Sequence, residues 1–297
     1  MSARPTISVV TPSLNQGRYL EACIRSVLDQ HYDGLEYIVI DGRSTDGSLE
    51  IIRKYATRFS YWTSEPDAGH YDAVNKGFTR STGEIMAWLN SDDMYLPGCL
   101  PVVAGIFAAH PEVEWLTSIH PVHWTDAGET CWVGHAPGFN REFFFRGGNL
   151  GADDLYSRGW IQQESTFWRR SLWDRAGARL STEYFLAADF DLWARFYKSA
   201  ELYGVDSLLG GFRLQSQQRS HTHRERYIAE ARHILAAHGG RQYGTAGRLA
   251  RRYLLPRVEP ILRRSKTALR LGVAYRTNLI TYTGRDGSWE LSNGIVY

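Results

Sequence analysis

Two adjacent carboxylates, Asp92 and Asp93, lie just after the apolar run 85–89, with Asn90 and Ser91 between. Because an ionised carboxylate loses its hydration when it is buried without a partner, this position predicts a cation held between the two side chains and an anionic ligand. Hard divalent ions such as Mg²⁺ and Mn²⁺ take oxygen ligands and keep positions open for substrate phosphates. An isolated Asp-Asp pair is also typical of a solvated turn. The surrounding sequence has to decide between these two interpretations.

Polar segments also end three earlier apolar runs, at 6–11, 35–40 and 60–63. The alternation of apolar run, polar loop and amphipathic segment predicts a parallel sheet with crossover helices. In such sheets the ligand lies outside the carboxyl ends of the strands, where these loops meet. The polar strand ends are Thr11 to Asn15, Asp41 to Asp46, Asp67 to Asp72, and Asp92 with Asp93. Four solvated loops are the alternative reading of the same pattern.

Four motifs stand in order within the first hundred residues. They are Thr11-Pro12-Ser13-Leu14-Asn15, Asp41-Gly42-x-Ser44-Thr45-Asp46-Gly47, Gly69-x-x-x-Ala73-x-Asn75-x-Gly77 and Leu89-Asn90-Ser91-Asp92-Asp93. Together they resemble the donor-binding half of family 2 glycosyltransferases, which are inverting enzymes with the GT-A fold. The resemblance implies an α/β, Rossmann-like mixed sheet with flanking helices. It also implies a domain at 1–224, with a donor-binding half at 1–100 and an acceptor half at 101–224, followed by a helical basic tail at 225–297.

The resemblance further implies a UDP-sugar as the donor. Asp41 is expected to accept the N3–H of uracil, and a carboxylate is well suited to that hydrogen bond. Asp92 and Asp93 are expected to hold Mn²⁺ or Mg²⁺, which neutralises the departing diphosphate. Asn90 stands where the first acid of the common Asp-x-Asp arrangement is expected. The residues expected to bind the nucleotide sugar are Thr11, Pro12, Ser13, Asn15, Asp41, Ser44, Asp67, Asp72, Asn75, Lys76, Asn90 and Asp92.

Asp189 is the candidate catalytic base. In the resemblance it takes the place of the catalytic Asp, with Ala188 instead of the usual Glu and Leu192-Trp193-x-Arg195 completing the pattern. An acceptor hydroxyl needs a carboxylate within hydrogen-bond reach to take its proton as the new bond forms. One base on the face opposite the leaving group predicts a single displacement with inversion. The alternative role is that of a helix N-terminal acid stabilised by the helix dipole.

The acceptor side is less readable from the sequence. Gln163, Glu164 and Trp193 are expected to contact the acceptor. The aromatic and glycine-rich stretch 139–160 predicts an acceptor-binding loop or an apolar corner of the core, without a preference between them. His221 lies in a polar loop, where it is either a late metal ligand or a solvated histidine.

The basic residues concentrate near the end of the chain. Ten Lys or Arg and one acid, Glu259, lie between 241 and 276. The stretch from Arg248 to Arg276 is a basic amphipathic segment that suits an anionic membrane surface. Packing of its apolar face on the main domain is the alternative. Nucleic-acid binding is not expected, because no recognisable module accompanies the charge.

The length and amino-acid composition are those of an ordinary globular protein. It has 297 residues, of which 43% are hydrophobic and 22% are charged. Its three cysteines are widely separated, which predicts a reduced protein without disulfides or a cysteine metal site. No apolar run approaches the roughly 20 residues that span a bilayer. We therefore expect a cytoplasmic protein that is peripheral on the inner face of the cytoplasmic membrane.

The sequence thus predicts a metal-dependent, inverting glycosyltransferase of the hexosyltransferase type. It is expected to move a sugar from a UDP-sugar to a hydroxyl of a saccharide or polyprenyl-linked acceptor in surface-polysaccharide assembly. A sugar nucleotidylyltransferase is the second hypothesis, but the loop 13–17 lacks the glycine-rich basic sequence that would cradle a phosphate. A non-catalytic nucleotide-sugar-binding scaffold is the third, and in that protein Asp189 would be dispensable.

Overall fold

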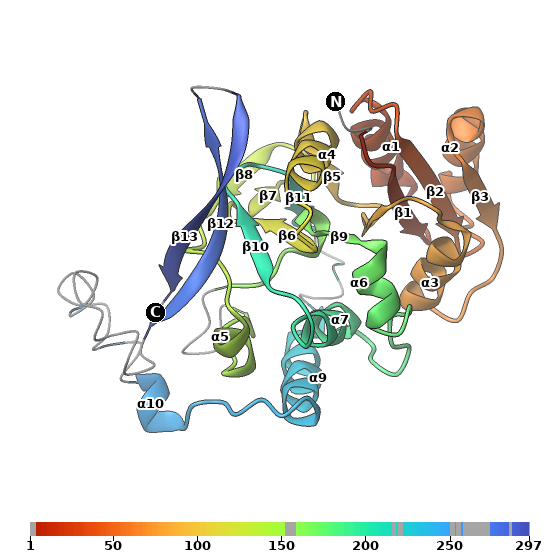
Figure 1. Ribbon diagram of the computed structural model, residues 1–297. Coiled ribbons are helices and arrows are strands. Elements are labelled where there is room, and N and C mark those ends of the chain that lie inside the picture. The colour runs from red at the N-terminus through yellow and green to blue at the C-terminus, as the bar shows by residue number, and fades with distance from the viewer. Residues whose placement is uncertain are drawn as a thin grey trace.

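The computed structural model describes residues 4–151, 159–215, 218, 222–249, 253, 257, 274–284 and 287–296 (Figure 1). Within these residues a large mixed sheet has the strand order β13-β12-β10-β6-β9-β4-β1-β2-β3. A second, smaller sheet has the order β5-β11-β7-β8. None of the described helices is both long enough and apolar enough to cross a membrane.

The predicted parallel strands of the first hundred residues are confirmed. They are β1 (Ile7–Ser13), β2 (Leu35–Asp41), β3 (Tyr61–Ser64) and β4 (Ile85–Trp88). All residues of β1 and β4 are buried, as expected for strands covered by helices on both faces. The register pairs Ser13 with Asp41 and Asp41 with Ser64. The carboxyl ends of β1, β2 and β3 therefore lie side by side.

The second half of the chain extends the same sheet. Strand β9 (Phe167–Arg169) runs antiparallel between β4 and β6 (Trp115–Ser118), and β10 (Leu202–Val205) runs parallel to β6. Strand β6 is buried throughout, as expected for a strand in the interior of the large sheet.

The last described residues also join this sheet. Strands β12 (Tyr275–Thr283) and β13 (Ser288–Val296) form a hairpin, drawn in blue in Figure 1, that pairs with β10. The segment predicted as a helical tail contains this hairpin in addition to two helices, α9 (Arg224–Ala237) and α10 (Thr245–Leu249).

The small sheet connects the acidic turn to the second half of the chain. Strand β5 (Met94–Tyr95) directly follows Asp93 and pairs with β11 (Gly210–Arg213). Strand β11 in turn pairs with the hairpin of β7 (Val122–Trp124) and β8 (Thr130–Val133). Residues more than a hundred positions apart are thereby fixed next to the end of β4.

Helices cover both faces of the large sheet (Figure 1). One core contains residues of α1 (Gly17–Leu28), α2 (Ser48–Tyr55) and α4 (Cys99–Ala109). The other core contains residues of α3 (His70–Arg80), α5 (Arg141–Phe145), α6 (Arg170–Arg175), α7 (Ala188–Phe196) and α9. Two short 3-10 helices, η1 (Ala56–Arg58) and η2 (Gln163–Ser165), complete the helical elements used below.

Trp193 belongs to this second core, and the prediction that it contacts the acceptor is wrong. Its side chain is 1% exposed. The ring stacks on Trp88 and Trp115 with centroid distances of 6.1 and 5.5 Å. A side chain enclosed in this way fills the core and cannot meet a ligand.

The aromatic stretch that begins at 139 follows the apolar-corner alternative where it is described. Phe143 and Phe144 in α5 are 1% and 0% exposed. Phe144 stacks on Phe190 of α7 with a centroid distance of 4.5 Å. Residues 152–158 of the same stretch lie outside the described part of the chain.

Candidate active site

The turn that follows β4 holds Asp92 and Asp93 through neutral hydrogen-bond donors. The backbone N–H of Arg213 donates to Asp93 Oδ1 at 2.9 Å, and Asn90 Nδ2 donates to Asp93 Oδ2 at 3.2 Å. Gln215 Nε2 donates to Asp92 Oδ2 at 2.7 Å. Strand β11 and the residues after it therefore fix the orientation of both carboxylates.

Two further carboxyl groups, Glu164 and Asp189, belong to the same electrostatic cluster. Glu164 lies in η2, is 2% exposed, and its Oε1 has no hydrogen-bond partner among the described residues. Asp189 lies in the first turn of α7. Electrostatic repulsion links Glu164 to Asp92, Asp93 and Asp189. The structure thus brings together three predicted site residues and the predicted acceptor residue Glu164.

The pKa values of these carboxyl groups are all raised. Burial raises the pKa of Asp189 to about 7 and, with the charges of Asp189 and Asp92, that of Glu164 to about 8. Burial also raises the pKa of Asp93, and the neighbouring charges of Asp92 and Glu164 add to the effect. Carboxyl groups with such pKa values exchange protons near neutrality, which is what a general base requires.

The acidic turn fits a hard divalent cation. Asp92 and Asp93 offer carboxylate oxygens, and Asn90 Oδ1 is buried without a hydrogen-bond partner in the described structure. Oxygen donors of this kind suit Mg²⁺ or Mn²⁺, which commonly take one or two carboxylates and complete their shell with water and phosphate oxygens. No group of three or more His, Cys, Asp or Glu side chains among the described residues could hold a metal. The predicted ligand His221 lies outside those residues.

The loops after β1 and β2 bind each other at the expected nucleotide pocket. Asp41 is fully buried and accepts hydrogen bonds from Ser44 N at 2.9 Å, Ser44 Oγ at 2.5 Å and Ser64 Oγ at 2.6 Å. Asn15, with φ of 53°, donates through its backbone N–H to Ser44 Oγ at 2.8 Å. Asn15 Oδ1 accepts from the backbone N–H of Thr45 at 2.8 Å. These contacts fix the carboxylate of Asp41 at the edge of the sheet.

The remaining residues of β1 in the predicted pocket are buried. Thr11, Pro12 and Ser13 all belong to β1. Thr11 Oγ1 lies 3.1 Å from the hydroxyl of Tyr37. The hydroxyl oxygen of Ser13 is buried and has no hydrogen-bond partner in the described structure.

The segment before α3 packs against the loop after β2. Asp67 Oδ1 accepts from the backbone N–H of Gly69 at 2.9 Å. A Cβ added to Gly42 would lie 2.6 Å from Asp67 Oδ2, so a larger residue would displace the Asp67 carboxylate. Lys76 pairs with Asp72 at 2.9 Å and donates to the carbonyl of Pro66 at 3.2 Å. These residues therefore lie at one edge of the predicted nucleotide pocket.

Both polar atoms of the Asn75 side chain bind the backbone of Leu180. Its Nδ2 donates to the Leu180 carbonyl at 2.9 Å, and its Oδ1 accepts from the Leu180 N–H at 2.8 Å. The side chain thus ties α3 to the segment that leads to α7. Gln163 is also tied down, because its Nε2 donates to the carbonyl of Trp88 at 2.5 Å. Its Oε1 is buried and has no hydrogen-bond partner among the described residues.

Glu230 on α9 is a site residue that the sequence did not reveal. Its carboxylate accepts hydrogen bonds from the backbone N–H groups of Phe185, Leu186 and Ala187 at 3.2, 2.9 and 3.2 Å. These groups directly precede Ala188, where α7 begins. Although burial opposes it, the hydrogen bond from Leu186 and the pairing with Arg226 lower the pKa of Glu230. Glu230 therefore holds the segment that presents Asp189.

The comparisons relate part of this chain to a known family. Residues 8–121 match the family described as Glycosyl transferase family 2. A putative teichuronic acid biosynthesis glycosyltransferase of Bacillus subtilis is 38% identical over 95 residues, which are 31% of this chain and 38% of the relative. The chain thus spans well under half of the curated relatives that match it at 38% identity or more.

Solved structures show the same fold at low sequence identity. A mannosyltransferase from Pyrobaculum calidifontis in complex with GDP-Man and Mn²⁺ has a TM-score of 0.57 at 19% identity, covering 92% of this chain and 80% of that one. S. aureus TarS 1-349 in complex with UDP-GlcNAc has a TM-score of 0.56 at 16% identity, covering 90% and 76% of the two chains. The GT-A fold class predicted from the sequence is confirmed. The family match over 8–121 includes the four motifs that carry the resemblance.

Replacement of Glu164 by Gln is expected to change how stability depends on pH. The pKa of Glu164 is about 8 in the fold, against about 4.3 in an unfolded chain. The neutral form therefore favours the fold, and this stabilisation is lost as the pH rises through about 8. Without divalent metal, the free energy of unfolding of the wild-type protein should fall between about pH 6 and pH 8.5. In Glu164→Gln this fall should be smaller by about 2 kcal/mol.

Chemical denaturation in EDTA at both pH values measures this effect. Glu183→Gln, at an exposed glutamate, is the matched control and should behave like the wild-type protein. An equal pH dependence in wild type and Glu164→Gln would contradict the assignment.

Removal of the Glu230 carboxylate is expected to loosen the start of α7. Glu230→Ala leaves three backbone N–H groups without their acceptor and should lower the free energy of unfolding by about 1–3 kcal/mol. Amide hydrogen exchange at 185–189 should accelerate more than exchange in α4. Glu225→Ala, at an exposed position of the same helix, is the control and should leave both quantities unchanged. Unaltered exchange in Glu230→Ala would show that the carboxylate does not hold this segment.

Proposed function

We propose that this protein is a metal-dependent, inverting glycosyltransferase of the hexosyltransferase type. It moves a sugar from a UDP-sugar to a hydroxyl group of a saccharide or polyprenyl-linked acceptor. The observation that carries the proposal is Asp189, a partly buried carboxyl group with a pKa raised to about 7, which interacts with Glu164 and through it with the Asp92–Asp93 turn. The family match over 8–121 supports the same class of reaction.

In the proposed reaction Asp189 takes the proton of the acceptor hydroxyl as its oxygen attacks the anomeric carbon. The bond between that carbon and the diphosphate oxygen breaks in the same displacement, and the configuration at the carbon inverts. A base with a pKa near neutrality is ionised in a large fraction of molecules and still accepts a proton readily. Glu230 contributes indirectly, because it holds the three residues before α7.

Asp92 and Asp93, with Asn90 Oδ1, are the groups that would hold the divalent ion. Bound Mn²⁺ or Mg²⁺ supplies positive charge to the departing diphosphate. The chain's own contribution is to fix the two carboxylates through Arg213, Gln215 and Asn90 before a donor arrives. Such preorganisation avoids rearrangement during the reaction.

The donor assignment rests on Asp41. Ser44 and Ser64 hold its carboxylate at the edge of the sheet, where we propose that it accepts the uracil N3–H. Thr11, Pro12, Ser13, Asn15, Asp67, Asp72 and Lys76 surround this position in the proposal. The comparison structures contain UDP-GlcNAc in one case and GDP-Man in the other. The choice of uridine therefore depends on the role of Asp41.

The proposed acceptor belongs to surface-glycan assembly, by analogy with the relative named for teichuronic acid biosynthesis. We further propose that the stretch from Arg248 to Arg276 contacts an anionic membrane surface on the cytoplasmic side. Most of that stretch lies outside the described residues. The domain limits 1–224 and 225–297 also remain predictions, with the acceptor half at 101–224.

Asp189→Asn should abolish most transfer while it preserves donor binding. We expect kcat to fall at least about 100-fold, because a positioned general base contributes that much or more. The assay follows release of nucleoside diphosphate from UDP-GlcNAc, UDP-glucose and GDP-mannose, with a bacterial lipid extract as the acceptor source. Asp174→Asn, at an exposed aspartate, is the control. Near-normal turnover in Asp189→Asn with intact donor binding would show that another group acts as the base.

The pH profile gives an independent readout of the same residue. Asp189 acts only when ionised, so the wild-type rate should rise with pH through about 7, the pKa that burial gives this group. The rise is measured as kcat/KM between about pH 5 and pH 9. A flat profile over this range would contradict the assignment of Asp189 as the base.

A further inference from the structure

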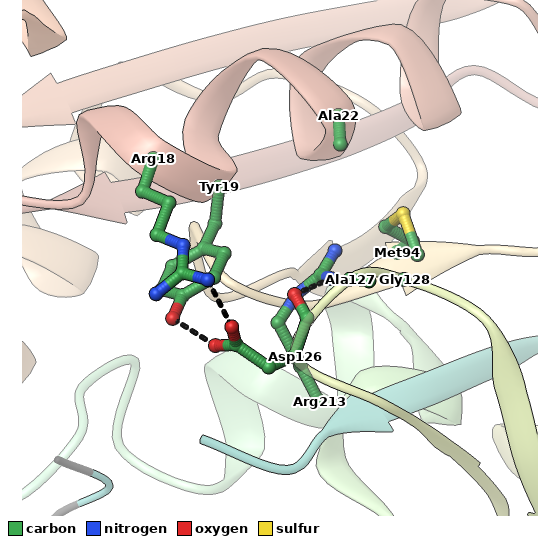
Figure 2. A pocket seen from close by; sticks show the side chains of 8 residues that line it. All are labelled: Arg18, Tyr19, Ala22, Met94, Asp126, Ala127, Gly128 and Arg213. Atoms are coloured by element: carbon green, nitrogen blue, oxygen red, sulfur yellow. Dashed lines mark hydrogen bonds and ion pairs between the residues drawn. The ribbon is translucent and has the colours of Figure 1, made fainter. Parts of the chain in front are cut away.

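A pocket lies beside the acidic turn, between α1 and the turn that joins β7 to β8 (Figure 2). Its volume is 270 Å³. Sites for whole drug-sized ligands have volumes of about 300–1,000 Å³, so this pocket suits one group of a larger substrate. The residues that line it are Arg18, Tyr19, Ala22, Met94, Asp126, Ala127, Gly128 and Arg213.

Two guanidinium groups meet at one aromatic ring in this pocket. Arg18 and Arg213 place their Cζ atoms 5.4 and 5.0 Å from the ring centroid of Tyr19. Such contacts stabilise a cation at a ring face and fix the plane of the guanidinium group. The two charges approach from different elements, because Arg18 belongs to α1 and Arg213 to β11. The pocket is therefore electropositive.

Arg213 is buried, and its charge acts on the nearby Asp92 carboxyl group without forming an ion pair with it. Only 2% of the residue is exposed. Its Nε donates to the Asp92 carbonyl at 2.6 Å, and its Nη1 donates to the Asp126 carbonyl at 3.0 Å. No ion pair joins it to a carboxylate within the described part of the chain. Carbonyl oxygens satisfy hydrogen bonds but do not neutralise a charge, so an anion in the pocket would gain from this group.

Asp126 already places a carboxylate at the mouth of the pocket. It binds Nη2 of Arg18 and the hydroxyl of Tyr19, as the dashed lines in Figure 2 show. The Arg18 and Asp126 side chains are 69% and 41% exposed. An ion pair exposed to that degree contributes only about 0–1 kcal/mol, so a bound anion can replace it. Asp126 thus occupies a position that suits an oxyanion of the substrate.

We infer that this pocket is a subsite for an oxyanion, a phosphate or a carboxylate, carried by the sugar acceptor. The oxyanion of the ligand replaces the Asp126 carboxylate as the hydrogen-bond acceptor of Arg18 and Tyr19. The buried Arg213 supplies a fixed positive charge. The Asp92 carbonyl accepts from Arg213, so the subsite shares a wall with the turn of the proposed metal site. The assignment to the acceptor rests on the proposed function and on the origin of Asp126 in the predicted acceptor half.

Binding of small anions to the full-length protein tests this inference. Inorganic phosphate and glucuronate are titrated separately at constant ionic strength, without donor, and the dissociation constant is measured by protein-observed NMR. At least one of the two anions should bind, and the two arms distinguish phosphate from carboxylate. Arg18→Gln should weaken that binding about tenfold, because it removes a charged donor. Asp126→Asn should strengthen it severalfold, because it removes the competing negative charge.

Arg25→Gln, at another exposed arginine of α1, is the control and should leave binding unchanged. Equal affinities in wild type, Arg18→Gln and Asp126→Asn would overturn the subsite. Loss of phosphate binding on addition of UDP with Mn²⁺ would assign the pocket to the donor and overturn the acceptor role. These titrations need no turnover, so their failure is distinguishable from failure of the transfer assay with Asp189→Asn.

Discussion

Four carboxyl groups share one poorly hydrated corner of this protein, and their mutual repulsion is the constraint on which the site depends. Asp93 and Glu164 are almost completely shielded from water, and Asp92 and Asp189 adjoin them. The groups that bind Asp92 and Asp93 are an amide N–H and two side-chain amides, all of them neutral. Neutral donors orient a carboxylate without neutralising it, and the nearby Arg213 charge compensates that of Asp92 only in part. The pKa values of the four carboxyl groups are therefore raised, and their oxygen atoms are available to a cation.

The scaffold explains how such an unfavourable cluster persists. Asp92 and Asp93 follow β4 in the middle of the large sheet, and β5 and β11 fix them from one side. Asp189 enters from α7, whose first residues are held by Glu230 of α9. Tightly packed tryptophans, among them Trp88 and Trp193, connect β4 to α7 beneath the site. Packing of this kind supplies the free energy that offsets the buried charges.

Much of the donor half could be predicted because its signals are local. Each strand of the first hundred residues is a short apolar run, and each polar residue of interest directly follows one. Parallel pairing then brings Ser13, Asp41 and Ser64 into register without any further information. The motif order added the family and the GT-A fold. Asp189 could be found because it stands at the start of a helix with a recognisable pattern.

The remaining features depend on contacts between distant parts of the chain. Glu230 binds residues more than forty positions earlier, and Arg213 binds a turn more than a hundred positions earlier. Neither residue has a local pattern that distinguishes it from a surface charge. Trp193 failed as an acceptor contact for the same reason, because its neighbours Trp88 and Trp115 come from other strands. Aromatic residues beside a catalytic motif fit the core and the ligand equally well until the packing is known.

The central claim is that the acidic turn holds a metal and a nucleotide together. Calorimetric titration of UDP into the wild-type protein and Asp93→Asn, each with and without Mn²⁺, tests it most directly. We expect Mn²⁺ to strengthen UDP binding to the wild-type protein at least about tenfold, and Asp93→Asn to lose this gain. Equal UDP affinity with and without Mn²⁺ in a folded wild-type sample would contradict it.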